Sequence, residues 1–200
     1  MDRPVGAQVT GSTGTGLTEP QRERRSRMRG AAIELAVEGG WDGVQMREVA
    51  ARSQVALGTL YRYFPSKEYL LVSVMLDEIG ELAERLSVRP PEGDDPVDRV
   101  VDVLRRANRA LQREPQVTVA MIRALVTGDE VVAPVVAGVR EAMRGIISEA
   151  LGAPAAAQRV LEIDLLGDVW LASLVSWISG VEPASSVVAK LESATRVLLG

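Results

Sequence analysis

Side chains suited to bind a polyanion gather in residues 57–67. Three hydroxyl groups in this run can reach phosphate oxygens or base edges: Thr59, Tyr61 and Tyr63. Gly58 has no side chain, so a helix that carries it can approach DNA closely. Lys67 directly follows Ser66, a residue type that caps helices, so its ammonium would join the free N–H groups of a helix N-terminus. Together these residues predict binding to DNA phosphates.

Two short helices must hold these residues in place. Residues 45–51 have apolar side chains at i, i+3 and i+4, which predicts a helix of about two turns. Residues 56–63 predict a second short helix, and the turn at residues 53–55 joins the two. These are the dimensions of a helix-turn-helix, in which the second helix enters the major groove and the first braces it.

A longer helix and a polar arm precede this pair. Thr18 and Gln21 have the spacing of a capping box, and a Gly-Gly pair at residues 39–40 should end the helix. Residues 1–17 are rich in Gly, Thr and Ser and are expected to form a disordered arm. The helix carries a dense basic run: Arg22, Arg24, Arg25, Arg27 and Arg29. These arginines could contact DNA phosphates or form a solvated face, and the sequence leaves both readings open.

The composition excludes many kinds of enzyme. The 200-residue chain has no Cys and no His, which rules out disulfides, thiol nucleophiles, Cys/His zinc sites and Ser-His-Asp triads. We therefore expect no enzyme activity, no cofactor and no metal. The formal net charge is −4, but the first 70 residues hold ten basic and eight acidic side chains and the acidic excess lies beyond them. This asymmetry suggests two functions on one chain.

Neither a membrane span nor a secretory signal is expected. The longest apolar stretch, residues 165–179, is interrupted by Asp168 and falls short of the roughly 18 consecutive apolar residues of a span. The N-terminus lacks a basic start followed by an apolar segment. These features predict a cytoplasmic protein.

The remainder of the chain should also be helical, because apolar residues recur with helical spacing between Pro and Gly breaks. Helices are expected over residues 67–88, 96–113, 116–127, 129–151, 154–179 and 183–199. The predicted fold class is all-α with about nine helices. Its parts are a disordered arm (residues 1–17), a three-helix DNA-binding domain (residues 18–66) and a ligand-binding and dimerisation domain (residues 67–200).

The string GTLYRYFPSK at residues 58–67, preceded by MREVA at residues 46–50, closely resembles the DNA-binding signature of TetR-family transcriptional regulators. The resemblance implies a helix-turn-helix, a double-stranded DNA operator and a homodimer. Residue types and the resemblance together suggest ten DNA-binding residues: Arg24, Gln45, Arg47, Leu57, Gly58, Thr59, Tyr61, Arg62, Tyr63 and Lys67. Leu60 and Phe64, four residues apart, are expected in the core instead.

Three positions depart from the usual family pattern. Gln45 stands where Thr or Ser usually caps the second helix, and Gln54 stands where Gly is common in the turn. Leu57 replaces a common Lys, which removes one phosphate partner, although an apolar side chain could touch a thymine methyl group.

A further resemblance extends into the C-terminal half of the chain. Residues 44–47, 55–67, 108–115 and 168–172 are similar to the actinobacterial KstR-type repressors of cholesterol catabolism. Repressors of that type are released from DNA by steroid acyl-CoA thioesters. The resemblance therefore implies a small apolar ligand, either a steroid or a fatty acyl-CoA thioester.

The helices beyond residue 67 are apolar on more than one face, as expected where a helix packs on neighbours and also lines a cavity. The candidate pocket residues are Met75, Ile79, Leu104, Leu111, Met121, Leu125, Ile147, Leu166 and Trp170. The charged candidates for a ligand carboxylate or the CoA phosphates are Arg106, Arg109 and Arg123. Taken singly, each of these residues is more often core or solvated surface than a ligand contact.

The last two helices carry more apolar surface than one inner face needs, which predicts a two-fold dimer interface. Val169, Trp177 and Leu191 are its candidate residues, with Trp177 as the anchor. In such a dimer, a ligand that tilts the helix beginning at Lys67 would change the spacing of about 34–36 Å between the two recognition helices.

The sequence thus predicts a ligand-responsive repressor that leaves a palindromic operator when an apolar effector binds. One alternative is a TetR-family repressor of a drug efflux pump, although its polyspecific pocket would favour several aromatic residues and only Trp170 and Trp177 follow Tyr69. The other alternative is a helical protein-interaction scaffold that does not bind DNA. The intact set of hydroxyl groups and Lys67 argues against a scaffold.

Overall fold

The computed structural model describes residues 18–200, so the expected disordered arm lies outside the described residues. This part of the chain forms ten helices and no strand, which confirms the all-α fold class. The helices are α1 (Glu19–Gly43), α2 (Met46–Arg52), α3 (Leu57–Tyr63), α4 (Lys67–Val88), α5 (Pro96–Arg113), α6 (Pro115–Leu125), α7 (Ala133–Leu151), α8 (Ala153–Gln158), α9 (Val160–Ile178) and α10 (Ala184–Leu199).

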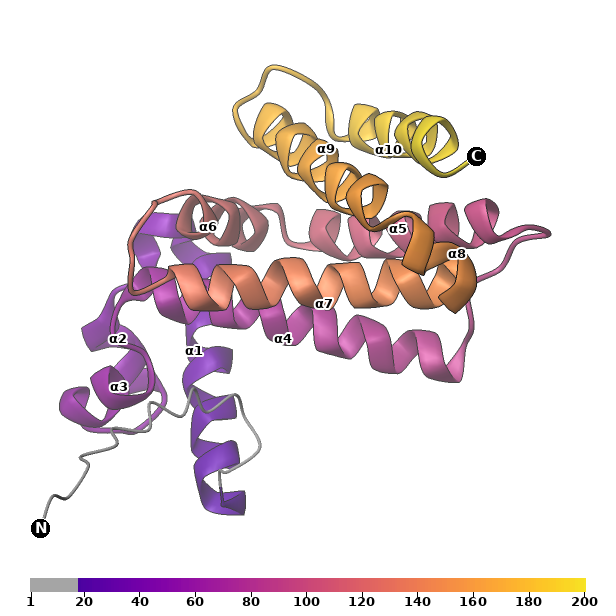
Figure 1. Ribbon diagram of the computed structural model, residues 1–200. Coiled ribbons are helices and arrows are strands. Elements are labelled where there is room, and N and C mark those ends of the chain that lie inside the picture. The colour runs from indigo at the N-terminus through magenta and orange to yellow at the C-terminus, as the bar shows by residue number, and fades with distance from the viewer. Residues whose placement is uncertain (1–17) are drawn as a thin grey trace, which may run out of the picture.

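The helices fall into three groups in space. The short helices α2 and α3 lie beside α1 at one end of the molecule, and the long helices α4 and α7 run side by side away from them (Figure 1). Helix α6 packs against both α1 and α4. Helices α9 and α10 pair with each other on the far side, where α10 rests on α5. Helix α4 therefore leads from the helix-turn-helix to the helices that follow it, α5 to α10, which are called the larger group below.

Buried side chains of the helix-turn-helix are part of the continuous hydrophobic core of the chain. Leu60 and Phe64 are fully buried, as expected, together with Val49 of α2. The hydroxyl of buried Ser53 donates a hydrogen bond of 2.6 Å to the Val49 carbonyl, so this polar group is satisfied inside the core. These contacts fix the turn between α2 and α3.

Several predicted helix boundaries agree with the structure and others require correction. Helices α4 and α5 have the predicted bounds. Helix α7 begins only at Ala133, because the Asp129 carboxylate accepts the Val131 N–H and holds residues 129–132 in a turn. Helix α6 ends at Leu125, two residues before the predicted end, and Gly128 follows with a positive φ of 76°.

The predicted helix over residues 154–179 is two helices, so the described chain has ten helices and not about nine. Arg159 separates α8 from α9 with a non-helical φ of −129° and ψ of 32°. Its guanidinium donates a hydrogen bond to the Leu199 carbonyl at the end of α10. The residue at the break therefore contacts the C-terminal end of α10, a tertiary contact that local propensity does not contain. Similarly, α1 is bent at the Gly39–Gly40 pair and continues to Gly43.

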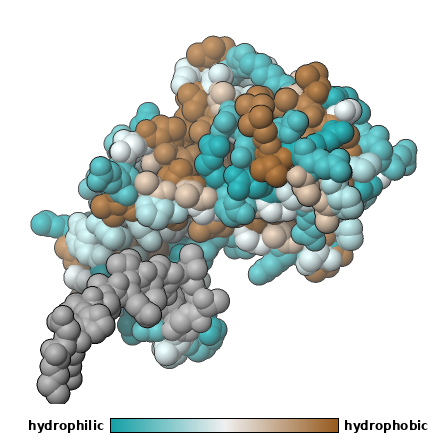
Figure 2. All heavy atoms as spheres, viewed as in Figure 1, coloured by the Kyte–Doolittle hydropathy of each residue, from teal (hydrophilic) through white to brown (hydrophobic). Residues whose placement is uncertain are grey.

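Apolar side chains remain exposed on the outer side of the α9 and α10 pair. Figure 2 shows hydrophobic surface in the region that these helices occupy in Figure 1. Leu161 and Leu165 of α9 are 68% and 42% exposed, and Val197 of α10 is 83% exposed. Within residues 18–200, no helix is both long enough and apolar enough to span a membrane.

Candidate DNA interface and ligand pocket

The predicted DNA-binding residues lie on and around α2 and α3. Five of them are exposed on the surface: Gln45, Arg47, Gly58, Tyr61 and Arg62. The other five are half-buried: Arg24, Leu57, Thr59, Tyr63 and Lys67. Tyr61 is 45% exposed. The helix-turn-helix therefore presents the polar groups that DNA contact would need, and their contact with DNA stays a prediction.

Lys67 is held by a partner that the sequence did not reveal. Its Nζ donates a hydrogen bond of 3.1 Å to the Trp41 carbonyl and lies 3.9 Å from the centroid of the Trp41 ring. Burial lowers the pKa of the ammonium, although Glu68 and Asp42 act in the opposite direction. The Ser66 hydroxyl caps α4 as expected by accepting the Tyr69 N–H at 3.0 Å. Lys67 thus joins the end of α1 to the start of α4, in addition to any contact with phosphate.

The departures from the family pattern have visible structural effects. Gln54 has a positive φ of 58°, a conformation that glycine adopts more readily than other residues. Gln45 occupies the N-cap position of α2, but its side chain turns back and donates a hydrogen bond of 2.9 Å to the Asp42 carbonyl. Leu57 begins α3 and packs partly against the core, so only part of its side chain is available to DNA.

Some arginines of the α1 basic run are used inside the protein. Arg29 Nε lies 2.5 Å from Asp77 Oδ2 on α4, and Arg25 lies 3.7 Å from the same carboxylate oxygen. Arg22 pairs with Glu19 on the same helix. Arg24 and Arg27 make no ion pair within residues 18–200. The sequence left open whether these arginines contact DNA phosphates or form a solvated face. Neither description fits Arg25 and Arg29, because they link α1 to α4.

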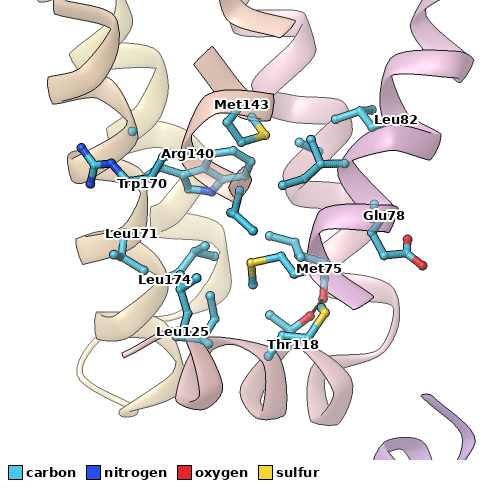
Figure 3. Close-up of a pocket in the computed structure, with 18 of the residues that line it drawn as sticks. Met75, Glu78, Leu82, Thr118, Leu125, Arg140, Met143, Trp170, Leu171 and Leu174 are labelled. Carbon is cyan, nitrogen blue, oxygen red and sulfur yellow. Dashed lines mark hydrogen bonds between the residues drawn. The ribbon is translucent and has the colours of Figure 1, made fainter. Parts of the chain in front are cut away.

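A cavity of about 370 Å³ lies among α4, α5, α6, α7 and α9, with one wall residue from α1 (Figure 3). Seven of the nine predicted pocket residues line it: Met75, Ile79, Leu111, Met121, Leu125, Ile147 and Trp170. Leu104 and Leu166 do not line it, and both are buried in the core, with 2% and 0% exposure. Ligand binding by the seven residues stays a prediction.

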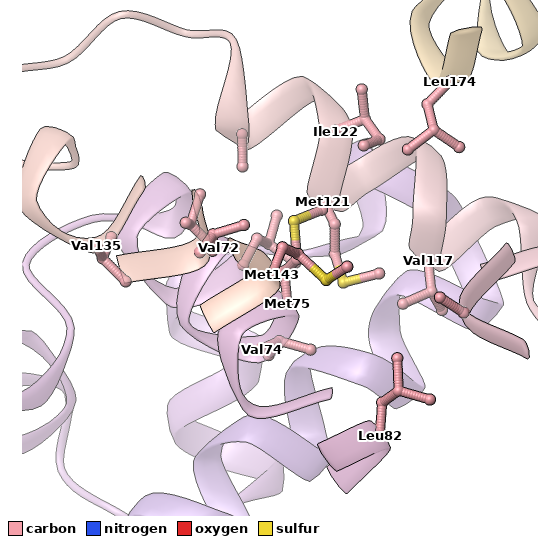
Figure 4. Close-up of a cluster of buried hydrophobic side chains, with 14 of the residues drawn as sticks. Val72, Val74, Met75, Leu82, Val117, Met121, Ile122, Val135, Met143 and Leu174 are labelled. Atoms are coloured by element: carbon pink, nitrogen blue, oxygen red, sulfur yellow. The ribbon is translucent and has the colours of Figure 1, made fainter. Parts of the chain in front are cut away.

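The sequence reading missed several wall residues, among them Met143, Leu171, Leu174, Thr118 and Ile33. Helical spacing was a usable signal for Leu174, which lies one turn after Trp170 on α9. The sulfur-containing side chains of Met75, Met121 and Met143 come together from three helices (Figure 4). Methionine is flexible and polarizable, so this wall can adapt to ligands of irregular shape.

Few polar groups interrupt the inner surface of the cavity. The Thr118 hydroxyl is satisfied, because it donates to the Leu111 carbonyl at 2.5 Å. Trp170 Nε1 is buried and has no hydrogen-bond acceptor among the described residues. Burial of such a donor without an acceptor costs about 1–3 kcal/mol. A ligand oxygen that accepted a hydrogen bond from it would therefore stabilise the complex.

Charged residues surround the cavity. Arg140 pairs with Asp168 at 2.8 Å, and Arg144 pairs with Asp164 at 2.8 Å. Arg85 and Arg113 also contribute to the wall. The three arginines named from the sequence, Arg106, Arg109 and Arg123, do not line the cavity. Arg106 is instead fixed by Asp102 at 2.6 Å and by the carbonyls of Arg89 and Pro90.

The predicted dimer residues differ in their accessibility. Val169 and Trp177 on α9 are half-buried, so both can still contact a partner. Leu191 is only 1% exposed in the single chain and packs inside it. Leu191 is therefore a core residue, which corrects its assignment to the interface. Leu161, which is 68% exposed on α9, was not among the apolar residues from which the interface was predicted.

The two halves of the chain match two described families. Residues 30–74 match "Bacterial regulatory proteins, tetR family", and residues 93–198 match "Tetracyclin repressor-like, C-terminal domain". The second match alone covers more than half of the chain. The matched ranges include the helix-turn-helix and most of the cavity wall.

Individual relatives are similar over nearly the whole chain. The HTH-type transcriptional repressor KstR of Rhodococcus jostii is 39% identical over 90% of this chain and 84% of its own length. KstR of Mycobacterium tuberculosis is 38% identical over 92% of this chain and 84% of its own length.

Solved structures show the same arrangement of helices. A TetR transcriptional regulator from Rhodococcus sp. RHA1 has a TM-score of 0.81 and 36% identity, over 90% of this chain and 98% of its own. FadR of Thermus thermophilus, a TetR-family repressor in complex with lauroyl-CoA, has a TM-score of 0.69 and 26% identity, over 88% and 93% of the two chains. The chain belongs to the tetR family of bacterial regulatory proteins and is a ligand-responsive DNA-binding repressor.

Proposed function

We propose that this chain represses genes of lipid or steroid catabolism and leaves its operator when a fatty acyl-CoA or steroid acyl-CoA thioester occupies the cavity. The observation that carries the proposal is the cavity of about 370 Å³, with apolar inner walls and charged residues around them. Its volume falls in the range of about 300–1,000 Å³ that ligand pockets have. The apolar part of the thioester would fill the interior, and the CoA phosphates would meet arginines such as Arg113.

The chemistry of the wall favours an aliphatic or steroidal ligand over the varied aromatic drugs of an efflux regulator. Trp170 is the single aromatic side chain among the described lining residues. The remaining interior is built from aliphatic side chains and methionines. The relatives support the same class, since one is a repressor in complex with lauroyl-CoA and others are KstR repressors.

Helix α4 gives ligand binding a route to the DNA-binding helices. It starts at Lys67, directly after the helix-turn-helix, and its residues Met75 and Ile79 line the cavity two to three turns later. A homodimer on a palindromic operator needs its recognition helices about 34–36 Å apart. A ligand that binds more tightly to a state with another spacing would weaken DNA binding. Because its operator would be chromosomal, the protein would act in the cytoplasm.

The test is retention of genomic DNA fragments on the purified protein, with sequencing of the retained DNA at two salt concentrations. We expect enrichment of a palindromic site, a steep decrease of affinity with salt, and release by lauroyl-CoA or by a steroid acyl-CoA. Free CoA is the control for the head group, and Tyr61→Ala is the control for the recognition helix. A protein that enriches no palindrome at low salt would contradict the repressor assignment. Release by neither thioester would contradict the ligand class alone.

A further inference from the structure

The first helix of the DNA-binding region contributes directly to the ligand cavity. Ile33 of α1 lines the cavity together with residues of α4, α5, α6, α7 and α9. It lies in the middle of α1 and is half-buried against the hydrophobic core. A ligand that reaches this wall therefore touches the DNA-binding region itself, in addition to the helices of the larger group.

The part of α1 that carries Ile33 contacts two other helices that line the cavity, α4 and α6. One turn before Ile33, Arg29 Nε lies 2.5 Å from Asp77 Oδ2 of α4. Two turns after Ile33, the bend at Gly40 faces α6, where a Cβ at Gly40 would lie 3.5 Å from Gln116 Oε1. Helices α4 and α6 both contribute to the cavity. A change in the position of α1 must therefore alter its contacts with both helices.

We infer that contact between the ligand and Ile33 triggers release of DNA, so that a ligand too short to reach α1 occupies the cavity without releasing the operator. The inference rests on the proposed function and concerns the same cavity. Its physical basis is that a ligand shifts a conformational equilibrium only through contacts that differ between the two states. Contacts with α4, α5, α6, α7 and α9 hold the ligand in the cavity. Contact with Ile33 depends in addition on where α1 lies relative to α4.

Binding and release should therefore depend differently on ligand length. With saturated acyl-CoAs of 6 to 18 carbons, each added buried CH₂ contributes about 0.8 kcal/mol, so affinity should rise by about fourfold per carbon until the cavity is full. Release is measured at saturating ligand as the ratio of the operator Kd values with and without acyl-CoA. We expect this ratio to stay near one for short chains and to rise by at least about tenfold beyond a threshold length.

The decisive variant is Ile33→Ala, which removes wall atoms only from α1. It should move the release threshold to longer chains by about two carbons, with release expressed relative to the variant's own operator Kd without ligand. The matched control is Leu125→Ala, which shortens a wall residue of α6. It should weaken acyl-CoA binding and keep the release threshold at saturation. If the alanine variant folds poorly, Ile33→Val replaces it in the experiment. This change removes a single methyl group and should move the threshold in the same direction.

The possible outcomes separate this inference from the proposed function. If release follows occupancy at every chain length, and Ile33→Ala behaves like Leu125→Ala, the role of Ile33 is overturned while the acyl-CoA repressor stands. If no acyl-CoA of any length binds or releases DNA, the acyl-CoA function fails and this inference fails with it. If Ile33→Ala shifts the threshold and Leu125→Ala does not, the result supports the inference.

Discussion

Gln54 holds a backbone conformation that costs a residue with a side chain more than it costs glycine. Its φ is 58°, in the turn between α2 and α3, and its side chain is exposed. The left-handed conformation costs about 1–2 kcal/mol for most residues other than glycine. We expect Gln54→Gly to raise the free energy of unfolding by about 1 kcal/mol, measured by urea denaturation. Gln158→Gly, at an exposed helical residue of α8, should give no gain, and an equal gain at both sites would refute the backbone explanation.

Lys67 contributes to the stability of the protein as well as to its charge. Its ammonium donates to the Trp41 carbonyl and faces the Trp41 ring, contacts of about 0.5–1.5 and 0.5–1 kcal/mol respectively. We expect Lys67→Gln to lower the free energy of unfolding by about 1 kcal/mol, as measured by urea denaturation without DNA. Lys190→Gln, which breaks only an exposed pair with Glu182, should change it by less than about 0.5 kcal/mol. Equal effects in the two variants would contradict the role of Trp41.

The contact between α1 and α4 includes a poorly solvated ion pair. The side chains of Arg29 and Asp77 are only 19% and 23% exposed, and their closest atoms lack the alignment of a hydrogen bond. Burial raises the pKa of Asp77 against the influence of Arg29 and Arg25, and burial lowers the pKa of Arg29. Desolvation therefore outweighs attraction at both partners.

Removing one charge of this pair should be worse than replacing both. We expect Arg29→Met to destabilise the chain by about 1–3 kcal/mol at pH 7, because it takes the nearest cation away from a poorly solvated carboxylate, and the double variant Arg29→Met with Asp77→Leu to be at least as stable as the wild type. Because the pKa of folded Asp77 is raised, wild-type stability relative to Asp77→Asn should increase as pH falls through the folded pKa towards the unfolded value near 4. Urea denaturation between pH 4 and 7 measures this difference. A relative decrease at low pH would show that ion pairing dominates.

The sequence predicts elements better than it predicts contacts between them. Periodicity and Pro or Gly breaks set the bounds of α4 and α5, since both signals are local. The Arg159 side chain at the break between α8 and α9 contacts the C-terminal end of α10, and the burial of Leu191 depends on how α10 packs, so neither follows from local signals. Apolar character identified seven wall residues, but it could not separate them from buried Leu104 and Leu166. The entry of Ile33 into the cavity follows from the packing of α1 on α4 and α6.

The exposed side of α9 is best explained by contact with a second copy of the chain. Leu161 and Leu165 lie one turn apart and are 68% and 42% exposed, and half-buried Val169 continues the same face. Contiguous apolar surface of this kind marks interaction sites. A two-fold axis through it would pair α9 and α10 with their copies and set the distance between the two recognition helices.

Leu165→Glu should therefore separate the dimer without unfolding the chain. The residue is already partly exposed in the single chain, so a carboxylate costs little there, whereas in a dimer two charges would be buried near the axis. We expect monomers by sedimentation velocity, an unchanged helical circular dichroism spectrum, and operator affinity reduced by more than about tenfold because each monomer reads only one half-site. Val88→Glu places the same charge on a residue that is 87% exposed at the end of α4, and this variant should remain a dimer with normal affinity. A dimeric Leu165→Glu protein would move the interface away from this face of α9.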